Sequence, residues 1–147
     1  MTEPATAGSN PTLLETTAVR DGDDFAINRQ KWFTSSADGA AFAIMMAVTA
    51  PDAASHQRSS MIIVPTETEG SSLVRNISMM GHAGRGHASH GEVIYQSFRV
   101  LQANLLGRAG AGFTIAQEQL GPGRIHHCMH WLGIASRSFD LLCACAN

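Results

Sequence analysis

The segment that most constrains the fold is the C-terminal one, which has a helical pattern and is apolar over most of its circumference. From about Phe113 its apolar residues recur at steps of three and four. Gly121-Pro122-Gly123 is expected to interrupt the helix, and the pattern resumes at Arg124. A helix with so wide an apolar surface has to be covered on several sides. Because the preceding part of the chain can cover only one side, we expect the first helix of a bundle whose other helices lie outside this chain.

The residues before this helix have the sequence pattern of an antiparallel β-domain. Short β-prone segments alternate with turn signals, as in sandwiches and barrels with turns about every 8–12 residues. Asp21-Gly22-Asp23 marks one turn, and Arg29-Gln30 is expected to form a hairpin between two short strands. The expected strands are Leu13–Arg20, Phe25–Asn28, Lys31–Thr34, Ala41–Thr49, Ser60–Val64, Ser72–Ile77 and Glu92–Val100.

The fold class is therefore predicted to be mainly β. We expect an antiparallel β-barrel or sandwich domain over residues 1–111, followed by a long C-terminal helix of an incomplete helical bundle over residues 112–147. Ala41–Thr49 is continuously apolar, which suits a strand buried on both faces.

The composition excludes several classes of protein. The formal net charge is −2, so no excess of Lys and Arg is available to bind nucleic-acid phosphates. Hydrophobic residues make up 44% of the chain, which excludes disorder as its main state. The longest apolar run, near Ala40–Ala47, is far shorter than the roughly 20 residues of a membrane span. Cys128, Cys143 and Cys145 lack a disulfide-framework spacing and are expected to be reduced thiols.

Charged residues make up only 15% of the chain, against about 25% in typical soluble domains. This low fraction suggests that much of the surface meets something other than water, although an Ala-, Ser-, Gly- and Met-rich composition alone has the same effect. His126 and His130 are four residues apart on the helix, but neither the glutamate of a HExxH motif nor a third ligand accompanies them. No metal site is therefore predicted.

Three motifs occur in order along the chain. Met1-Thr2-Glu3-Pro4 is followed by Ala7-Gly8-Ser9-Asn10, and Asn28 is followed by Lys31-Trp32-Phe33-Thr34. The third motif starts at Gly112-Phe113 and includes Leu120–Met129, LGPGRIHHCM. This combination resembles the acyl-CoA dehydrogenase family of flavoproteins, and the third motif is similar to the branch with the human members ten and eleven. The matches span the whole chain.

The resemblance implies a β-domain flanked by helical domains, with FAD between the β-domain and the C-terminal bundle. It implies α,β-dehydrogenation of an acyl-CoA thioester, with hydride transfer to flavin N5 and an electron-transferring flavoprotein as the acceptor. It also implies a homo-oligomer, located in the cytoplasm of a bacterium or in the mitochondria or peroxisomes of a eukaryote. Because the chain starts inside the first motif and ends in the first helix, we expect a fragment with weak or absent FAD affinity and no dehydrogenase activity of its own.

An isoalloxazine ring is a flat aromatic system with polar edges, so its site needs an apolar wall and a few fixed donors. By resemblance, Trp32 would stack on the ring, Phe33 would adjoin it and Thr34 would reach N5 and O4. The proposed FAD contacts are Met1, Thr2, Gly8, Ser9, Trp32, Phe33 and Thr34. The alternative for Trp32 is an ordinary tryptophan in the core of a strand.

The resemblance assigns Ser9 and Thr49 to the outer part of the acyl-CoA arm. It assigns the helix entry to the polar contacts of that arm, namely Gly121, Pro122, Gly123 and Arg124. Arg124 also suits pairing with a carboxylate at the start of a helix. No catalytic base is predicted in this chain, because Gly123 occupies one family position for it and the other position lies beyond Asn147.

Two alternatives remain open. The absence of a carboxylate at Gly123 is compatible with a non-catalytic β-barrel module for binding or assembly on the same scaffold. A related flavin oxidase differs in oxygen reactivity, and the sequence does not distinguish it.

Overall fold

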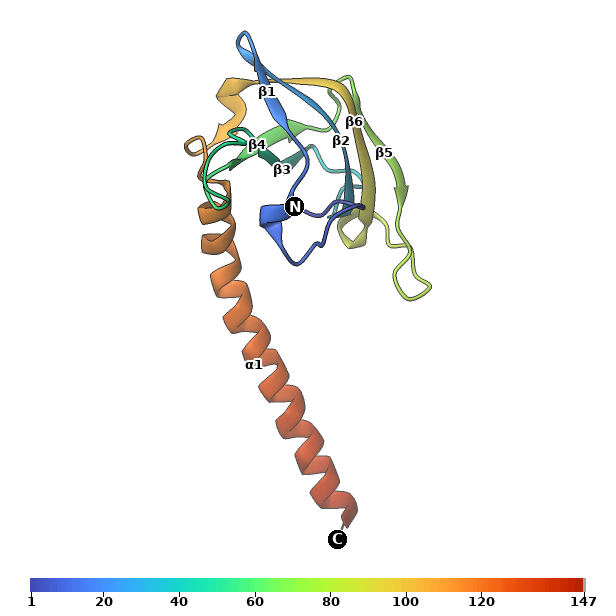
Figure 1. The fold of residues 1–147 in the computed structure, drawn as a ribbon. Helices are drawn as coiled ribbons and strands as arrows, with labels where there is room; N and C mark the ends of the chain where they lie inside the picture. The colour runs from blue at the N-terminus through green and yellow to red at the C-terminus, as the bar shows by residue number, and fades with distance from the viewer. Residues whose placement is uncertain (147) are drawn as a thin grey trace. The chain divides into compact units, whose positions relative to one another are not determined.

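The computed structural model describes residues 1–146, which divide into two compact units, Met1–Phe113 and the part of the chain from Thr114 onward. The first unit contains two antiparallel sheets (Figure 1). One sheet has the order β1 (Ala18–Asp21), β2 (Asp24–Ser35), β6 (His90–Leu101) and β5 (Ser71–Asn76). The other has the order β3 (Phe42–Val48), β4 (Ser59–Pro65) and β7 (Leu105–Leu106). Short 3-10 helices span Pro11–Leu13, Gly86–Ala88 and Gln102–Asn104.

Both sheets contribute to one hydrophobic core. Phe25 and Ile27 of β2 and Phe98 of β6 lie in this core together with Met45 of β3 and Ile62 of β4. Buried side chains alternate with exposed ones in much of β6, as expected for a strand with one face toward the core. The predicted fold class, a mainly β domain followed by one helix, is thus confirmed.

The turn predicted at Asp21-Gly22-Asp23 joins β1 to β2. Asp21 pairs with Asp24 in the register of the two strands. Gly22 has a φ of 62°, in the left-handed region that tight hairpin turns require and that glycine adopts without steric cost.

The hairpin predicted at Arg29-Gln30 is wrong, because β2 runs without a turn from Asp24 to Ser35. Arg29 pairs with Tyr95 and Gln30 with Ile94 in the register with β6, so both residues lie inside the ladder. Pairing with a strand more than sixty residues away overrides the weak local turn signal of these two residues. A further difference is that β3 is buried on both faces only in its second half, since Phe42 and Ile44 are exposed.

Helix α1 spans Gly112–Ala146, and its residues from Thr114 onward belong to the second unit. The break predicted at Gly121-Pro122-Gly123 is wrong: the helix is continuous and Pro122 lies inside it. A proline removes one backbone donor from a helix, but one missing hydrogen bond does not by itself end a helix of this length. Large apolar side chains are exposed along the helix, at Ile125, Met129, Trp131, Leu132, Ile134, Phe139, Leu141 and Leu142. No helix in residues 1–146 is both long and apolar enough to cross a bilayer.

The core predicts a large effect for one substitution in β6. Phe98→Ala should destabilise the chain by about 3–5 kcal/mol, because Phe98 is fully buried and packs edge-on against Tyr95. The matched control is Leu101→Ala at the exposed end of the same strand, with an expected effect within about 0.5 kcal/mol. Urea denaturation followed by circular dichroism measures both values, and equal losses would contradict this description of the core.

Candidate functional site

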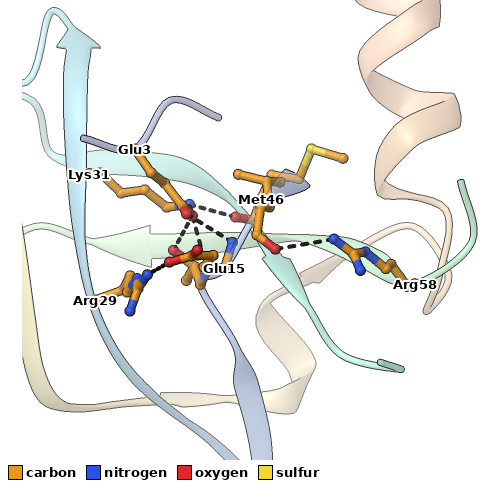
Figure 2. Close-up of polar contacts among 8 residues, drawn as sticks. Glu3, Glu15, Arg29, Lys31, Met46 and Arg58 are labelled. Atoms are coloured by element: carbon orange, nitrogen blue, oxygen red, sulfur yellow. Dashed lines mark hydrogen bonds and ion pairs between the residues drawn. The ribbon is translucent and has the colours of Figure 1, made fainter. Parts of the chain in front are cut away.

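A buried ion pair connects the N-terminal segment to β2. Only 2% of Glu3 and 5% of Lys31 are exposed, and Lys31 Nζ lies 2.7 Å from Glu3 Oε1 (Figure 2). Two charges removed from water in this way are stable only when they are paired and their remaining hydrogen-bonding positions are filled.

The polar groups around the pair fill these positions. Glu3 accepts hydrogen bonds from the backbone N–H groups of Glu15 and Thr16, at 2.9 and 3.0 Å, and from the Thr16 hydroxyl. Lys31 Nζ donates a second hydrogen bond to the carbonyl of Met46 in β3, at 2.9 Å. The pair therefore holds together four parts of the chain. These are the first motif, strand β2, strand β3 and the segment that precedes β1.

The pKa values of both groups are lowered, against the effect of burial for Glu3 and in line with it for Lys31. Burial raises the pKa of Glu3, but the hydrogen bonds from Lys31 and Thr16 and the charge of Lys31 outweigh it, so this pKa lies below its ordinary value. Burial lowers the pKa of Lys31, and Glu3 opposes this without fully compensating it. Glu3 is thus held as the carboxylate, and burial is the largest influence on the pKa of each group.

The first two motifs meet next to this ion pair. The backbone N–H of Trp32 donates a hydrogen bond of 2.9 Å to the carbonyl of Thr2. A Cβ atom on Gly8 would lie 2.9 Å from the Thr2 methyl group, so a larger residue would push the loop away from Thr2. The structure thus brings together three of the predicted FAD contacts, namely Thr2, Gly8 and Trp32.

Trp32 and Phe33 lie in a bulge of β2. Lys31 pairs with Val93 of β6 and Thr34 pairs with Gly91, so Trp32 and Phe33 together oppose the single residue Glu92. Strict alternation from the buried Lys31 would direct Phe33 into the core. The bulge instead leaves Phe33 39% exposed, with a φ of 50° that is uncommon for an aromatic residue. Bulges of this kind often redirect side chains beside functional sites.

The two aromatic rings of the bulge contact each other. The Trp32 and Phe33 centroids are 5.6 Å apart, with the planes at 87°. Trp32 is half-buried, so it is not the fully enclosed core tryptophan of the alternative interpretation. Thr34, the next residue in the predicted site, is also half-buried.

The other predicted residues are less closely associated. Met1 and Ser9 are exposed, and Thr49 Oγ1 lies 2.6 Å from Ser60 Oγ. Residues 121–124 were expected at the entry of a helix, but they lie inside α1. Arg124 donates a 3.0 Å hydrogen bond to Gln117, an amide and not a carboxylate. The substrate contacts therefore stay predictions.

Sequence reasoning missed Lys31 and Glu3 as an ion pair, although both stand inside the quoted motifs. Lys31 follows the polar residues Arg29 and Gln30, so no local sequence pattern marks it as buried. An open pocket of about 610 Å³ lies beside Glu3 and is lined by Glu3, Pro4, Ala5, Asn28, Arg29, Gln30, Ile94, Tyr95 and Gln96. Within residues 1–146, no three His, Cys, Asp or Glu side chains are grouped so that they could hold a metal ion.

The fold and the site define an antiparallel β-domain in which an N-terminal motif adjoins a tryptophan-bearing strand. The family model of the acyl-CoA dehydrogenase middle domain matches residues 1–97. The chain belongs to the acyl-CoA dehydrogenase family, as its motifs predicted.

Relatives match over nearly the whole chain. The probable acyl-CoA dehydrogenase FadE2 of Mycobacterium tuberculosis is 49% identical over 144 residues, which cover 97% of this chain and 35% of the relative. The mouse acyl-CoA dehydrogenase family member 11 is 41% identical over 146 residues, which cover 97% of this chain and 19% of the relative. A solved structure of a putative acyl-CoA dehydrogenase from Mycobacterium abscessus has a TM-score of 0.79 and 38% identity, covering 88% of this chain and 32% of that one.

The ion pair predicts a large loss of stability when one partner is removed. Lys31→Met should cost about 3–5 kcal/mol, because it leaves the Glu3 carboxylate buried without its counter-charge. The double variant Glu3→Gln with Lys31→Met should cost less than the sum of the single changes. Arg99→Met is the control, since Arg99 pairs with Asp21 and Asp24 at the surface, where about 0–1 kcal/mol is expected. Urea denaturation measures all four, and equal losses for the two single lysine and arginine variants would refute the role of the pair.

The lowered pKa of Glu3 predicts an acid-dependent stability difference. The folded pKa lies below the ordinary 4.5, so between the two values the unfolded chain binds more protons than the folded one. The stabilisation from Glu3 is therefore complete above about pH 4.5 and is lost as the pH falls through the folded pKa. The measurement is the free energy of unfolding of the chain and of Glu3→Gln from about pH 7 to about pH 3. A difference that stays constant with pH would show that the carboxylate is not preferentially stabilised.

Proposed function

We propose that this chain forms part of an FAD-dependent acyl-CoA dehydrogenase. In this proposal residues 1–111 are the middle β-domain and residues 112–147 are the start of the C-terminal helical domain. The chain spans about a third of the length of its M. tuberculosis relative and about a fifth of its mouse relative. Membership of the family supports the proposal, and the activity of the whole enzyme is inferred from that family.

One contact carries the proposal furthest. The 2.9 Å hydrogen bond from Trp32 N–H to the Thr2 carbonyl aligns the two segments to which FAD contacts were assigned. Gly8 approaches the Thr2 side chain so closely that a Cβ atom would lie 2.9 Å from its methyl group, which favours glycine at this position. An accessible indole beside backbone amides and hydroxyls is the kind of donor set that a flat ring with polar edges requires. The residues present therefore fit a flavin.

Each of these residues has a role in binding. Trp32 would stack against the ring, and Phe33 would support the indole from its side. The hydroxyl groups of Thr2 and Thr34 would donate hydrogen bonds to polar atoms of the ring, and Met1, Gly8 and Ser9 would contact the cofactor. Bound FAD would supply the acceptor for the hydride that leaves the β-carbon of the acyl thioester.

We propose no residue of this chain as the base that removes the α-proton. Gly123 has no side chain that could accept a proton. The chain's contribution to catalysis is thus binding and orientation. Ser9, Thr49 and the α1 residues Gly121, Pro122, Gly123 and Arg124 are proposed as contacts of the acyl-CoA arm.

An electron-transferring flavoprotein is the proposed electron acceptor, and the intact enzyme is proposed to be a homo-oligomer. We propose a cytoplasmic location if the source is bacterial and a mitochondrial or peroxisomal one if it is eukaryotic.

A hybrid enzyme tests the cofactor assignment. In this hybrid the present chain replaces the matching third of the M. tuberculosis relative. It should purify with bound FAD, and Trp32→Ala should weaken FAD binding about three- to tenfold, as expected for the loss of an aromatic stacking partner. Phe42→Ala, an exposed aromatic residue of the other sheet, is the matched control. Flavin absorbance per protein and FAD titration measure the effect.

The same hybrid separates the alternatives. A folded hybrid that lacks FAD would overturn the cofactor assignment. A hybrid that binds FAD, whose absorbance does not bleach with any acyl-CoA thioester, would favour the non-catalytic binding module. Rapid reoxidation of the bleached flavin by oxygen would favour the related oxidase.

A further inference from the structure

The side chain of Arg75 covers one face of the Trp32 indole. The Arg75 guanidinium carbon lies 5.6 Å from the ring centroid, within the range in which a cation is attracted by an indole face. Arg75 belongs to β5 and Trp32 to β2, and β6 lies between these two strands in the sheet (Figure 1). The arginine side chain therefore reaches across a whole strand to contact the indole.

Glu92 of the intervening strand holds the guanidinium in this position. Arg75 Nε lies 2.6 Å from Glu92 Oε2, and the Glu92 side chain is buried while that of Arg75 is largely exposed. The other carboxylate oxygen of Glu92 accepts a hydrogen bond from Gln30 Nε2 of β2. With a donor on each oxygen, the carboxylate cannot turn freely, so it fixes the guanidinium.

Irregularities in both neighbouring strands create this arrangement. On β2, Trp32 and Phe33 together oppose Glu92. On β5, Leu73 pairs with Val93 and Arg75 pairs with Glu92, so the residue between Leu73 and Arg75 has no partner in the register. This irregularity also lies beside Glu92. The two irregularities place Arg75 directly across from Glu92, which in turn lies opposite the aromatic pair.

These contacts matter because the indole is only half-buried. A half-buried side chain in a bulge is not held by surrounding core packing, so its ring plane has to be fixed by specific contacts. The edge contact with Phe33 is one of them, and the guanidinium on the ring face is the other.

We infer that Arg75, held by Glu92, is a positioning residue that fixes the ring plane of Trp32. The consequence for the flavin rests on the proposed function, since it requires that the indole receive the cofactor. The effect on the indole itself does not depend on any cofactor and can be measured without one.

The first experiment uses the full chain without flavin. Trp131→Phe leaves Trp32 as the single tryptophan, because the chain has two. In this background Arg75→Met should raise the acrylamide quenching constant of Trp32 fluorescence about two- to threefold, as the loss of a cation–π contact opens one ring face. The matched control is Arg99→Met, an exposed arginine of the same sheet that pairs with Asp21 and Asp24. Circular dichroism confirms that each variant is folded.

Two further variants guard against a general structural effect. Arg75→Lys keeps the positive charge but loses the planar group and should give an intermediate quenching constant. Glu92→Gln keeps the side-chain volume and should increase quenching, because the guanidinium loses its ionic partner. If Arg75→Met does not fold, these two variants decide the matter. Quenching that matches the Arg99→Met control in both would overturn the inference.

The second experiment measures FAD affinity in the hybrid enzyme. Arg75→Met should raise the dissociation constant about two- to fivefold relative to Arg99→Met. Increased quenching in the chain together with a hybrid that never binds FAD would leave the role of Arg75 intact and refute the proposed function. FAD binding in the hybrid together with unchanged quenching in the chain would refute the role of Arg75 alone.

Discussion

Glu3 and Lys31 form a buried ion pair, and each charge is stabilised by the other. Their carboxylate and ammonium groups also form hydrogen bonds with two backbone N–H groups, a hydroxyl and a carbonyl. Because Glu3 directly follows Thr2 and Lys31 directly precedes Trp32, the pair places both segments of the candidate site. The Thr2–Trp32 hydrogen bond forms at one end of this anchored region.

The candidate site thus combines a rigid part with an adaptable one. The ion pair and the strand ladder hold the backbone, while the bulge directs Trp32 and Phe33 away from regular alternation. Their side chains are then held by contacts at the surface, namely the edge contact between the rings and the guanidinium of Arg75. A binding site needs this combination, because its side chains must be accessible to a ligand and yet keep one orientation.

Local sequence signals predicted those features that local chemistry determines. The turn at Gly22 and the apolar runs of β3 and β4 were found, because a positive φ and a buried strand each leave a mark on a few adjacent residues. The hairpin at Arg29-Gln30 was wrong because β6 pairs with this segment from far along the chain. The break at Pro122 was wrong because a single proline is a weaker signal than the helical pattern on either side of it.

The sequence predicted only those residues of the candidate site that lie in a local motif. Its motif residues could be named from a family resemblance, but Arg75 and Glu92 lie 43 and 60 residues from Trp32 and carry no motif of their own. Only the strand order β2-β6-β5 makes them neighbours.

The placement of Glu92 between two irregular strands also restricts how this sheet can vary. A residue inserted into or deleted from β6 beside Glu92 would exchange the inner and outer faces for every later position of that strand. The pairing of β6 with β2 and with β5 would be disturbed together, since the register shift in each of these strands lies beside Glu92. Length changes are therefore expected in the connecting loops of homologous chains and not within this central strand.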